Sequence, residues 1–267
     1  MDPFLVQKPT RAKVPILISV PHCGIQFPDE IKDQFDPKLV QAPDDTDWFV
    51  DQLYDFAPAM GMTMISAVYS RLVIDLNRDP ESKPLYTDGR IITALCPTTT
   101  FLGEAVYNDK RNEVGNEEVK RRLSLYYQPY HQKIQEFLSD LKTTFGKVLL
   151  WDCHSIRQFV PTIQKEKFPD LILGSADEKS ASPDLIQGAL RDLGSDSYNI
   201  RHNHPFKGGT ITRSFGKPNE NQNALQLEMC KVHYMDDSET KYDVARANKM
   251  REVLKRTLGN LSEKLIG

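Results

Sequence analysis

Histidines and carboxylates follow two apolar segments of this chain, and residues of these types can bind a metal ion. Residues 148–151 are all apolar and lead directly into Asp152 and His154. Residues 14–20 are also mostly apolar and lead into His22. Two histidines placed at the ends of two strands can share one ion, because imidazole is a common metal ligand. A polar pair that only caps its strand is the alternative for Asp152 and His154.

The two apolar segments predict buried central strands of an α/β fold. Runs of this length and composition are typical of strands covered on both faces, and open α/β sheets bind ligands at the carboxyl ends of their strands. A chain of 267 residues is long enough for one large α/β domain, which we expect to span 1–267. The other predicted elements are strands at 62–68, 171–174 and 197–201, helices at 29–35, 116–145 (divided or kinked at Pro129), 183–193 and 242–265, and a loop at 80–97 with a turn at Asp88-Gly89.

Net charge indicates the class of partner, and cysteine content and hydropathy indicate the cellular compartment. The formal net charge is -3, so no basic surface favours nucleic acid or an anionic membrane, and a small-molecule partner is expected. The four cysteines are irregularly spaced, which is typical of reduced thiols and not of a disulfide framework. The sequence shows no signal-peptide pattern and no apolar run of membrane-spanning length. We therefore expect a cytoplasmic protein.

An acidic cluster precedes a helical pattern at residues 48–57. Asp44, Asp45 and Asp47 lie just before this pattern, where carboxylates cap a helix and complement its dipole. Alternatively, one of them completes a metal site, since zinc accepts two histidines and a carboxylate with one position left for water. The sequence leaves both interpretations open.

A second group of charged residues surrounds a short apolar segment, residues 72–74, which predicts a strand. Arg71 precedes it, and Asp75, Asn77 and Arg78 follow it. An arginine next to an asparagine is suited to binding a carboxylate. A structural ion-pair network that involves Asp75 is the alternative.

Residues 202–213 contain paired glycines flanked by polar side chains. Gly208 and Gly209 allow backbone conformations that other residues resist, and His204 and Arg213 lie on either side of them. This pattern suits a loop that folds over a ligand. A plain surface turn is the alternative.

A single glutamate, Glu228, occurs in the strand-like run 225–230. Gln226 and Glu228 share one face at a period of two, while apolar side chains occupy the other face. Burial in these surroundings should raise the pKa of the Glu228 carboxyl, which suits a general base that works near neutral pH.

The order and spacing of these segments resemble the N-formylglutamate amidohydrolase family over residues 14–257. That family is similar in fold to the zinc carboxypeptidases. The resemblance implies a phosphorylase/hydrolase-like α/β fold with a mixed, eight-stranded sheet flanked by helices. It also implies one zinc ion per chain, or another divalent metal, and hydrolysis of N-formyl-L-glutamate to formate and L-glutamate in histidine degradation. The segments that carry it are Val20–Gly24, Asp45–Trp48, Ser70–Arg78, Asp152–Ser155, Lys207–Gly209 and Leu225–Met229.

The resemblance also assigns roles to individual residues. His22 and His154 resemble the two histidine ligands, and Glu228 resembles the general base that acts on a zinc-bound water. Zinc carboxypeptidases place a glutamate three residues after the first histidine, but Ile25 occupies that position here. The carboxylate ligand must therefore come from elsewhere, and Asp47 is favoured over Asp45. Further implied roles are catalysis for Arg213 and substrate binding for Arg71, Asn77, Arg78, His204, Gly208 and Gly209.

Two other functions remain open at this stage. A related metal-dependent deacylase or carboxypeptidase would use the same machinery on another N-acyl amino acid or on a peptide. A non-catalytic protein that binds a metal or a small acidic ligand would not need Glu228 in an apolar strand, which argues against that class. The sequence does not decide the oligomeric state or the native metal.

Overall fold

A computed structural model of the chain describes residues 2–81, 93–195 and 197–267, so the predicted turn at Asp88-Gly89 lies outside the described residues. Within the described ranges, seven strands form one sheet in the order β1-β3-β2-β4-β7-β5-β6. The strands are β1 (Phe4–Gln7), β2 (Ile16–Val20), β3 (Thr63–Ala67), β4 (Val148–Ile156), β5 (Leu171–Gly174), β6 (Ile200–His202) and β7 (Gln222–Cys230).

The sheet is mixed, as expected. Strands β3, β2, β4 and β7 run parallel to one another, whereas β1 pairs antiparallel with β3 and β5 pairs antiparallel with β7. The expected eighth strand is absent from the described residues. The predicted strand at residues 72–74 is wrong, because this segment forms successive turns in which Val73 N donates to Ser70 O (2.9 Å) and Arg78 N donates to Asp75 O (3.2 Å).

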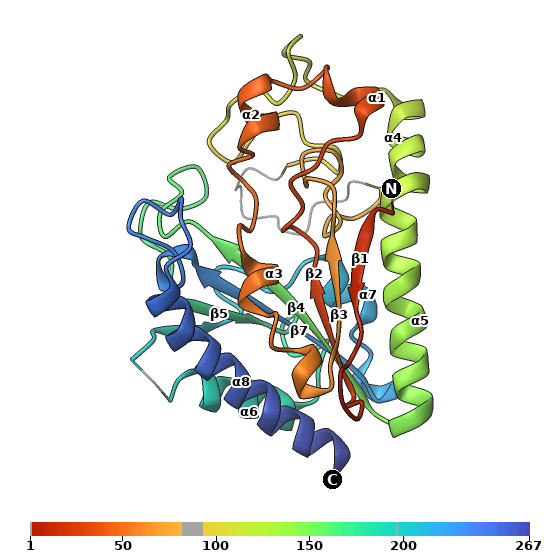
Figure 1. Cartoon of the computed structure of the whole chain (residues 1–267), viewed down its shortest axis with the longest axis vertical. Helices are drawn as coiled ribbons and strands as arrows, with labels where there is room; N and C mark the ends of the chain where they lie inside the picture. Colours follow the sequence, from red (N-terminus) through yellow and green to blue (C-terminus); the bar gives the residue numbers. More distant parts are fainter. Residues whose placement is uncertain (1, 82–92, 196) are drawn as a thin grey trace.

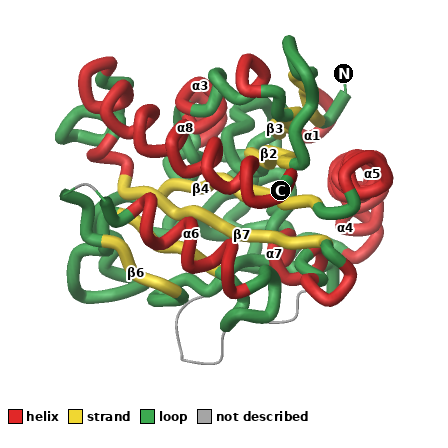
Figure 2. Tube along the Cα trace, turned by 90° about the horizontal axis from the view of Figure 1, so that it is seen from below, coloured by secondary structure: helices red, strands yellow, loops and turns green. Residues whose placement is uncertain are grey.

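Helices pack on both faces of the sheet, which runs through the middle of the molecule (Figure 1, Figure 2). Helices α3, α6 and α8 contribute to the core on one face, and α4, α5 and α7 contribute to the core on the other. The helices are α1 (Asp29–Lys32), α2 (Pro37–Gln41), α3 (Val50–Leu53), α4 (Asn116–Arg122), α5 (Gln128–Phe145), α6 (Pro183–Leu193), α7 (Thr210–Phe215) and α8 (Val244–Ile266), with 3-10 turns at Pro58–Met60, Pro218–Glu220 and Lys231–His233.

Three predicted helices differ in detail from the structure, and the one expected at 29–35 ends at Lys32 as α1. The helix expected at 48–57 shortens to α3, because Phe49 adopts a left-handed conformation (φ 62°) just before it and turns follow it. The long helix at 116–145 contains a π-helical segment at Leu123–Tyr127, next to Pro129. Proline has no backbone N–H, so the helical hydrogen-bond ladder must adjust where it occurs. The helix therefore stays continuous through an altered turn and does not break in two.

The two faces of the central strands differ in polarity, and this difference positions the site. On the face covered by α6 and α8, the strands are mainly apolar, as Trp151, Cys153 and Leu227 illustrate, with Ser155 and Asn223 as polar exceptions. On the opposite face, apolar residues give way to buried polar residues toward the carboxyl ends. Those polar residues are Ser19, Asp152, His154, Gln226 and Glu228.

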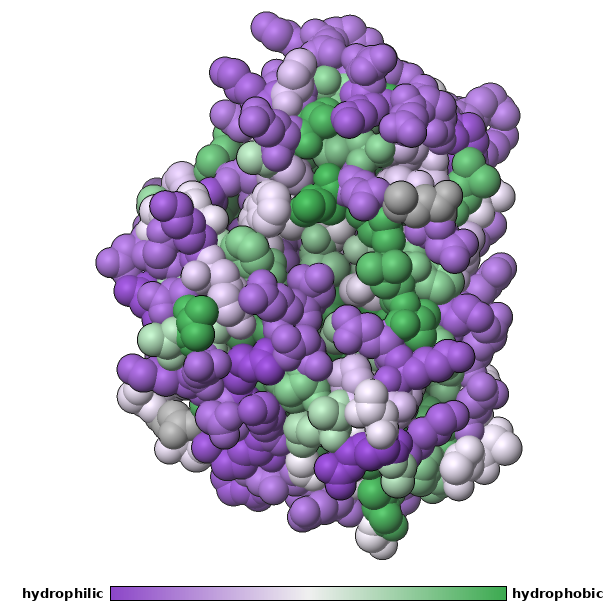
Figure 3. Space-filling view, viewed as in Figure 1, coloured by the Kyte–Doolittle hydropathy of each residue, from purple (hydrophilic) through white to green (hydrophobic). Residues whose placement is uncertain are grey.

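The surface in the view of Figure 3 is mostly hydrophilic, with small apolar areas between the charged side chains. No helix among the described residues is long and apolar enough to cross a membrane.

Candidate metal centre

The two predicted histidines come from neighbouring strands at a point where the chain diverges. His22 lies two residues beyond β2, and His154 lies near the end of β4, which pairs with β2 in parallel. From β2 the chain continues to β3 on one side, and from β4 it continues to β5, which lies beyond β7 on the other side. Ligands bind open α/β sheets at such switch points, because the loops separate there and leave a crevice.

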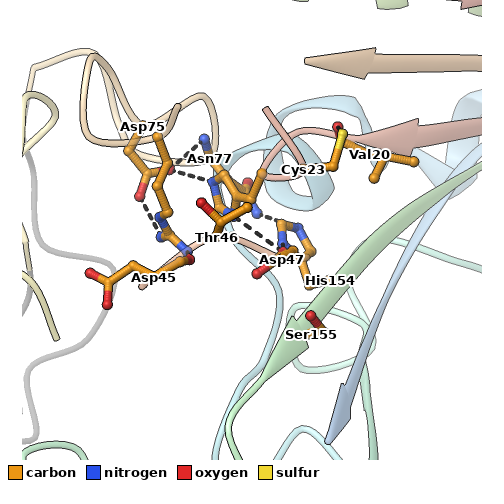
Figure 4. A network of polar contacts seen from close by, with 12 residues as sticks. Val20, Cys23, Asp45, Thr46, Asp47, Asp75, Asn77, His154 and Ser155 are labelled. Carbon is orange, nitrogen blue, oxygen red and sulfur yellow. Dashed lines mark hydrogen bonds and ion pairs between the residues drawn. The ribbon is translucent and has the colours of Figure 1, made fainter. Parts of the chain in front are cut away.

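Asp47 joins the two histidines to form a buried group that could hold a metal ion. The potential ligand atoms of His22, Asp47 and His154 all lie within 4.8 Å of one another. Asp47 Oδ2 lies 3.1 Å from His154 Nδ1 (Figure 4). The same oxygen lies 3.6 Å from His22 Nδ1. Among the described residues, His22 Nδ1 has no hydrogen-bond partner although it is buried. A buried polar atom without a partner is costly, and a metal ion at this position would satisfy it.

The opposite nitrogen of each imidazole contacts a carboxylate. His22 Nε2 lies 2.7 Å from Asp75 Oδ1, and His154 Nε2 lies 3.1 Å from Asp152 Oδ2. Histidines that bind metals usually donate their second N–H to such a carboxylate, which fixes the ring and the tautomer. Both rings therefore direct Nδ1 toward Asp47. The donor set and its supporting contacts fit a divalent metal such as zinc.

Neighbouring positive charges lower the pKa of two carboxylates, Asp75 and Asp47. Burial alone would raise the pKa of Asp75, but the charges of Arg71 and His22 outweigh burial and hold that pKa well below its usual range. The pKa of Asp47 is likewise lowered, because the hydrogen bond with His154 and the nearby charge of His22 outweigh its burial. Ionised carboxylates are the form that binds a cation.

The structure distinguishes Asp47 from Asp45. The backbone N–H of Asp47 donates to His22 O (2.9 Å), which holds this loop against the end of β2. The Asp45 carboxylate instead accepts a hydrogen bond from Phe101 N (2.9 Å) and points away from Asp47 and His154 (Figure 4). The predicted preference for Asp47 over Asp45 therefore agrees with the geometry of the group.

Glu228 lies beside the group on the adjacent strand. In the parallel pairing of β4 and β7, Glu228 is opposite His154 and Gln226 is opposite Asp152. Burial raises the pKa of the Glu228 carboxyl to about 8, against the opposing effect of the His154 charge. The predicted rise in this pKa is confirmed. The chain therefore places a carboxyl group that can exchange a proton near neutral pH next to the candidate metal site.

Arg71 and Arg78 both lie beside Oδ2 of the Asp75 carboxylate. Arg71 is buried and donates to Asp75 Oδ2 at 2.6 Å, and its guanidinium also lies over the Phe101 ring. Arg78 Nε lies 3.8 Å from the same oxygen and donates to Thr93 O at 3.2 Å. The two arginines thus add positive charge beside the metal group. Their contacts with a substrate stay a prediction.

The other predicted substrate-binding residues have different surroundings. Asn77 is buried against Asp152 and His154, and Gly209 packs directly on Asn77. Arg213 is an exposed residue of α7 and donates to Gly208 O at 2.8 Å. His204 is exposed and borders a surface hollow whose lining includes Asp170 and Arg201. The roles of these residues stay predictions.

Three further residues support the group, and the sequence had indicated Asp152 only as a polar residue at a strand end and Asp75 only as a member of a possible ion-pair network. Asp75 and Asp152 hold the two imidazoles, and Lys231 donates from Nζ to Thr46 O at 2.8 Å, next to Asp47. Residues two apart share one face of a strand. Asp152 precedes His154 by two residues, as Gln226 precedes Glu228, so this spacing could have indicated that Asp152 lies beside His154. No comparable pattern indicated Lys231.

The fold and the site together define an α/β protein with a candidate metal centre at the carboxyl ends of parallel strands. The sequence profile of the family described as N-formylglutamate amidohydrolase matches residues 14–235. The chain is 40% identical over 232 residues to an N-formylglutamate deformylase of Pseudomonas putida, with 86% of this chain and 85% of the relative covered. It is 38% identical to an N-formylglutamate deformylase of Pseudomonas aeruginosa, with 97% of each chain covered. The chain belongs to the N-formylglutamate amidohydrolase family.

Solved structures agree with this assignment. A crystal structure of N-formylglutamate amidohydrolase from Ralstonia eutropha superposes with a TM-score of 0.82 at 26% identity and covers 99% of both chains. A gene product of Agrobacterium tumefaciens has the same fold, with a TM-score of 0.72 at 17% identity over 97% of this chain and 95% of that one. The predicted family and α/β class are confirmed.

Proposed function

We propose that this protein is a metal-dependent amidohydrolase that cleaves N-formyl-L-glutamate to formate and L-glutamate, in the cytoplasm and as a step of histidine degradation. The observation that carries the proposal is the position of Glu228 opposite His154, beside the His22, Asp47 and His154 group. The names of the two Pseudomonas relatives support the choice of substrate.

One divalent ion would be held by His22, Asp47 and His154. Catalytic zinc sites use this ligand set of two histidines and one carboxylate. When bound, such an ion supplies Lewis-acid chemistry, since it makes a water molecule more acidic and polarises a carbonyl group. Asp75 and Asp152 keep both imidazoles oriented for this purpose.

Glu228 would move the proton. As water adds to the formyl carbon, the Glu228 carboxylate accepts a proton from it, and the carboxyl group then gives this proton to the amide nitrogen as the C–N bond breaks. The products are formate and the free amine of glutamate. The raised pKa of Glu228 suits both steps, because the group can accept and release a proton near neutral pH.

Arg71 and Arg78 would bind the negative charges of the substrate, which has two carboxylates. A guanidinium group matches a carboxylate in a bidentate geometry, and burial strengthens that contact. Arg71 is also suited to stabilise the oxyanion that develops on the formyl oxygen, because it lies next to the metal group through Asp75. Arg213, in the last turn of α7, is proposed as a further cation for the same purpose.

Arg78→Ala should mainly raise KM for N-formyl-L-glutamate, by roughly 10-fold or more, because a charged hydrogen bond to the substrate is lost. The loss should be much smaller for the amide of whichever substrate carboxylate Arg78 binds. Steady-state kinetics with the acid, the γ-amide and the α-amide would measure this. Arg111→Ala, which removes an arginine paired with Asp109, is a matched control. An equal loss on the acid and both amides would show that Arg78 is structural.

A release assay tests the proposed function as a whole. N-formyl-L-glutamate should be hydrolysed faster than N-acetyl- or N-succinyl-glutamate, N-formyl-aspartate or a short peptide. Removal of the metal with a chelator should abolish turnover, and added zinc should restore it. Preference for another acyl group or for the peptide would instead identify a related deacylase or a carboxypeptidase.

A further inference from the structure

We propose that Asn77 is a positioning residue that fixes both histidine–carboxylate pairs of the metal group at once. This inference rests on the proposed metal site but not on the identity of the substrate. It assigns Asn77 a role different from the substrate contact that the family resemblance implies.

One residue, Asn77, contacts both pairs. Its backbone N–H donates to Asp75 Oδ1 at 2.9 Å, and the same oxygen lies 2.7 Å from His22 Nε2. Its side-chain Nδ2 donates to Asp152 Oδ2 (3.3 Å) and lies 2.9 Å from His154 Nε2 (Figure 4). The relative orientation of the two imidazoles therefore depends on one buried residue, which is 4% exposed and reaches one pair through its backbone N–H and the other through its side-chain amide.

The amide of Asn77 is itself held by the segment that begins α7. Its Oδ1 accepts a hydrogen bond from Ile211 N at 2.8 Å. Its Nδ2 also lies 3.4 Å from Gln226 Oε1, which accepts the backbone N–H of Gly209 at 2.8 Å. Both ends of the amide are thus engaged within the protein, and a substrate carboxylate could bind Nδ2 only by displacing these contacts.

Gly209 allows this close packing. A Cβ atom at position 209 would lie 2.4 to 2.5 Å from the side-chain amide atoms of Asn77, closer than real Cβ contacts. Any larger residue would therefore push Asn77 away from Asp152 and His154. The paired glycines, which the sequence suggested were part of a loop over a ligand, here bring the backbone against the residue that supports the metal group.

Zinc affinity of the metal-free protein, measured by competition with a chelating indicator, tests the proposal without reference to activity. Asn77→Ala should weaken zinc binding about 10- to 100-fold, the usual effect of removing a group that orients metal ligands. Gly209→Ala should weaken it in the same direction through displacement of Asn77. Gly115→Ala is the matched control, because a Cβ at Gly115 meets nothing within 4 Å and affinity should not change.

Wild-type zinc affinity in a folded Asn77→Ala variant, with only KM raised, would overturn the proposal and favour a substrate contact. If Asn77→Ala shows no thermal unfolding transition, the Gln226→Leu variant provides the test instead, because it removes the acceptor that Asn77 and Gly209 share. Unchanged zinc affinity in Gln226→Leu would also overturn the proposal. Because affinity is measured without substrate, failure to hydrolyse N-formyl-L-glutamate would count against the proposed function alone.

Discussion

Glu228→Gln should lower kcat for N-formyl-L-glutamate by roughly 100-fold or more, the usual contribution of a general base. Glutamine keeps the size and shape of the side chain but cannot accept a proton, so only the proton transfer is removed. The variant should still bind one equivalent of metal, because Glu228 lies beside His154 and outside the His22, Asp47 and His154 group. Wild-type kcat in this variant would contradict the mechanism.

The pH dependence of stability provides an independent check on Glu228. Burial raises its pKa to about 8 in the folded chain, whereas the unfolded chain has the ordinary value of 4.5. Between these two values the folded state holds a proton that the unfolded state has released, so this group makes the metal-free wild type progressively less stable as pH rises. Glu228→Gln does not titrate. Thermal unfolding with a chelator present should therefore show the variant gaining stability relative to the wild type from pH 5 to pH 8.

Sequence patterns located the strands of the site well, because their signal is local. Residues 14–20 and 148–151 predicted β2 and β4, and the period of two in residues 225–230 placed Gln226 and Glu228 on one face. The predicted end of β4 was wrong, since this strand does not stop at Trp151 but continues through Asp152 and His154 to Ile156. Polar residues usually indicate a strand end, but here they pair with polar residues of β7 on the same buried face.

The contacts of residues 70–78 were not predictable from their own sequence. Leu72, Val73 and Ile74 are as buried as strand residues, so their composition favoured a strand. They form turns because Asp75 and Asn77 are bonded to partners that are distant in the sequence, such as His22 and Ile211. A pattern of local hydrophobicity contains no information about such long-range polar contacts.

The choice between Asp45 and Asp47 also depends on hydrogen bonds between residues that are distant in the sequence. Both carboxylates precede α3 and both are buried, so neither spacing nor burial separates them. The hydrogen bonds of the surrounding loop separate them. Asp47 N donates to His22 O, which turns the Asp47 carboxylate toward the imidazoles, whereas the Asp45 carboxylate accepts a hydrogen bond from Phe101 N. Burial raises the pKa of Asp45 to about 6, despite the opposing charge of Arg71, whereas the pKa of Asp47 is lowered. The structure thus favours Asp47 as the ionised ligand.

His22→Ala and His154→Ala should each abolish stoichiometric metal binding and, with it, activity. Each variant removes one of the three side chains that form the group among the described residues, and two remaining ligands are too few for a stable zinc site. Asp47→Ala should have the same effect, while Asp45→Ala should keep a full equivalent of metal, because its carboxylate is bound to Phe101 N. Metal content of purified protein, measured by elemental analysis after dialysis, distinguishes these outcomes.

His233→Ala is the matched histidine control, since His233 pairs with Asp170 on another part of the chain and should leave metal content unchanged. Thermal unfolding must show that each variant is folded. In metal-free protein, His22→Ala removes a buried Nδ1 that lacks a partner but also leaves Asp75 without its contact at 2.7 Å, so a moderate loss of stability is expected. Retention of a full equivalent of metal by folded His22→Ala and His154→Ala would show that the metal binds elsewhere.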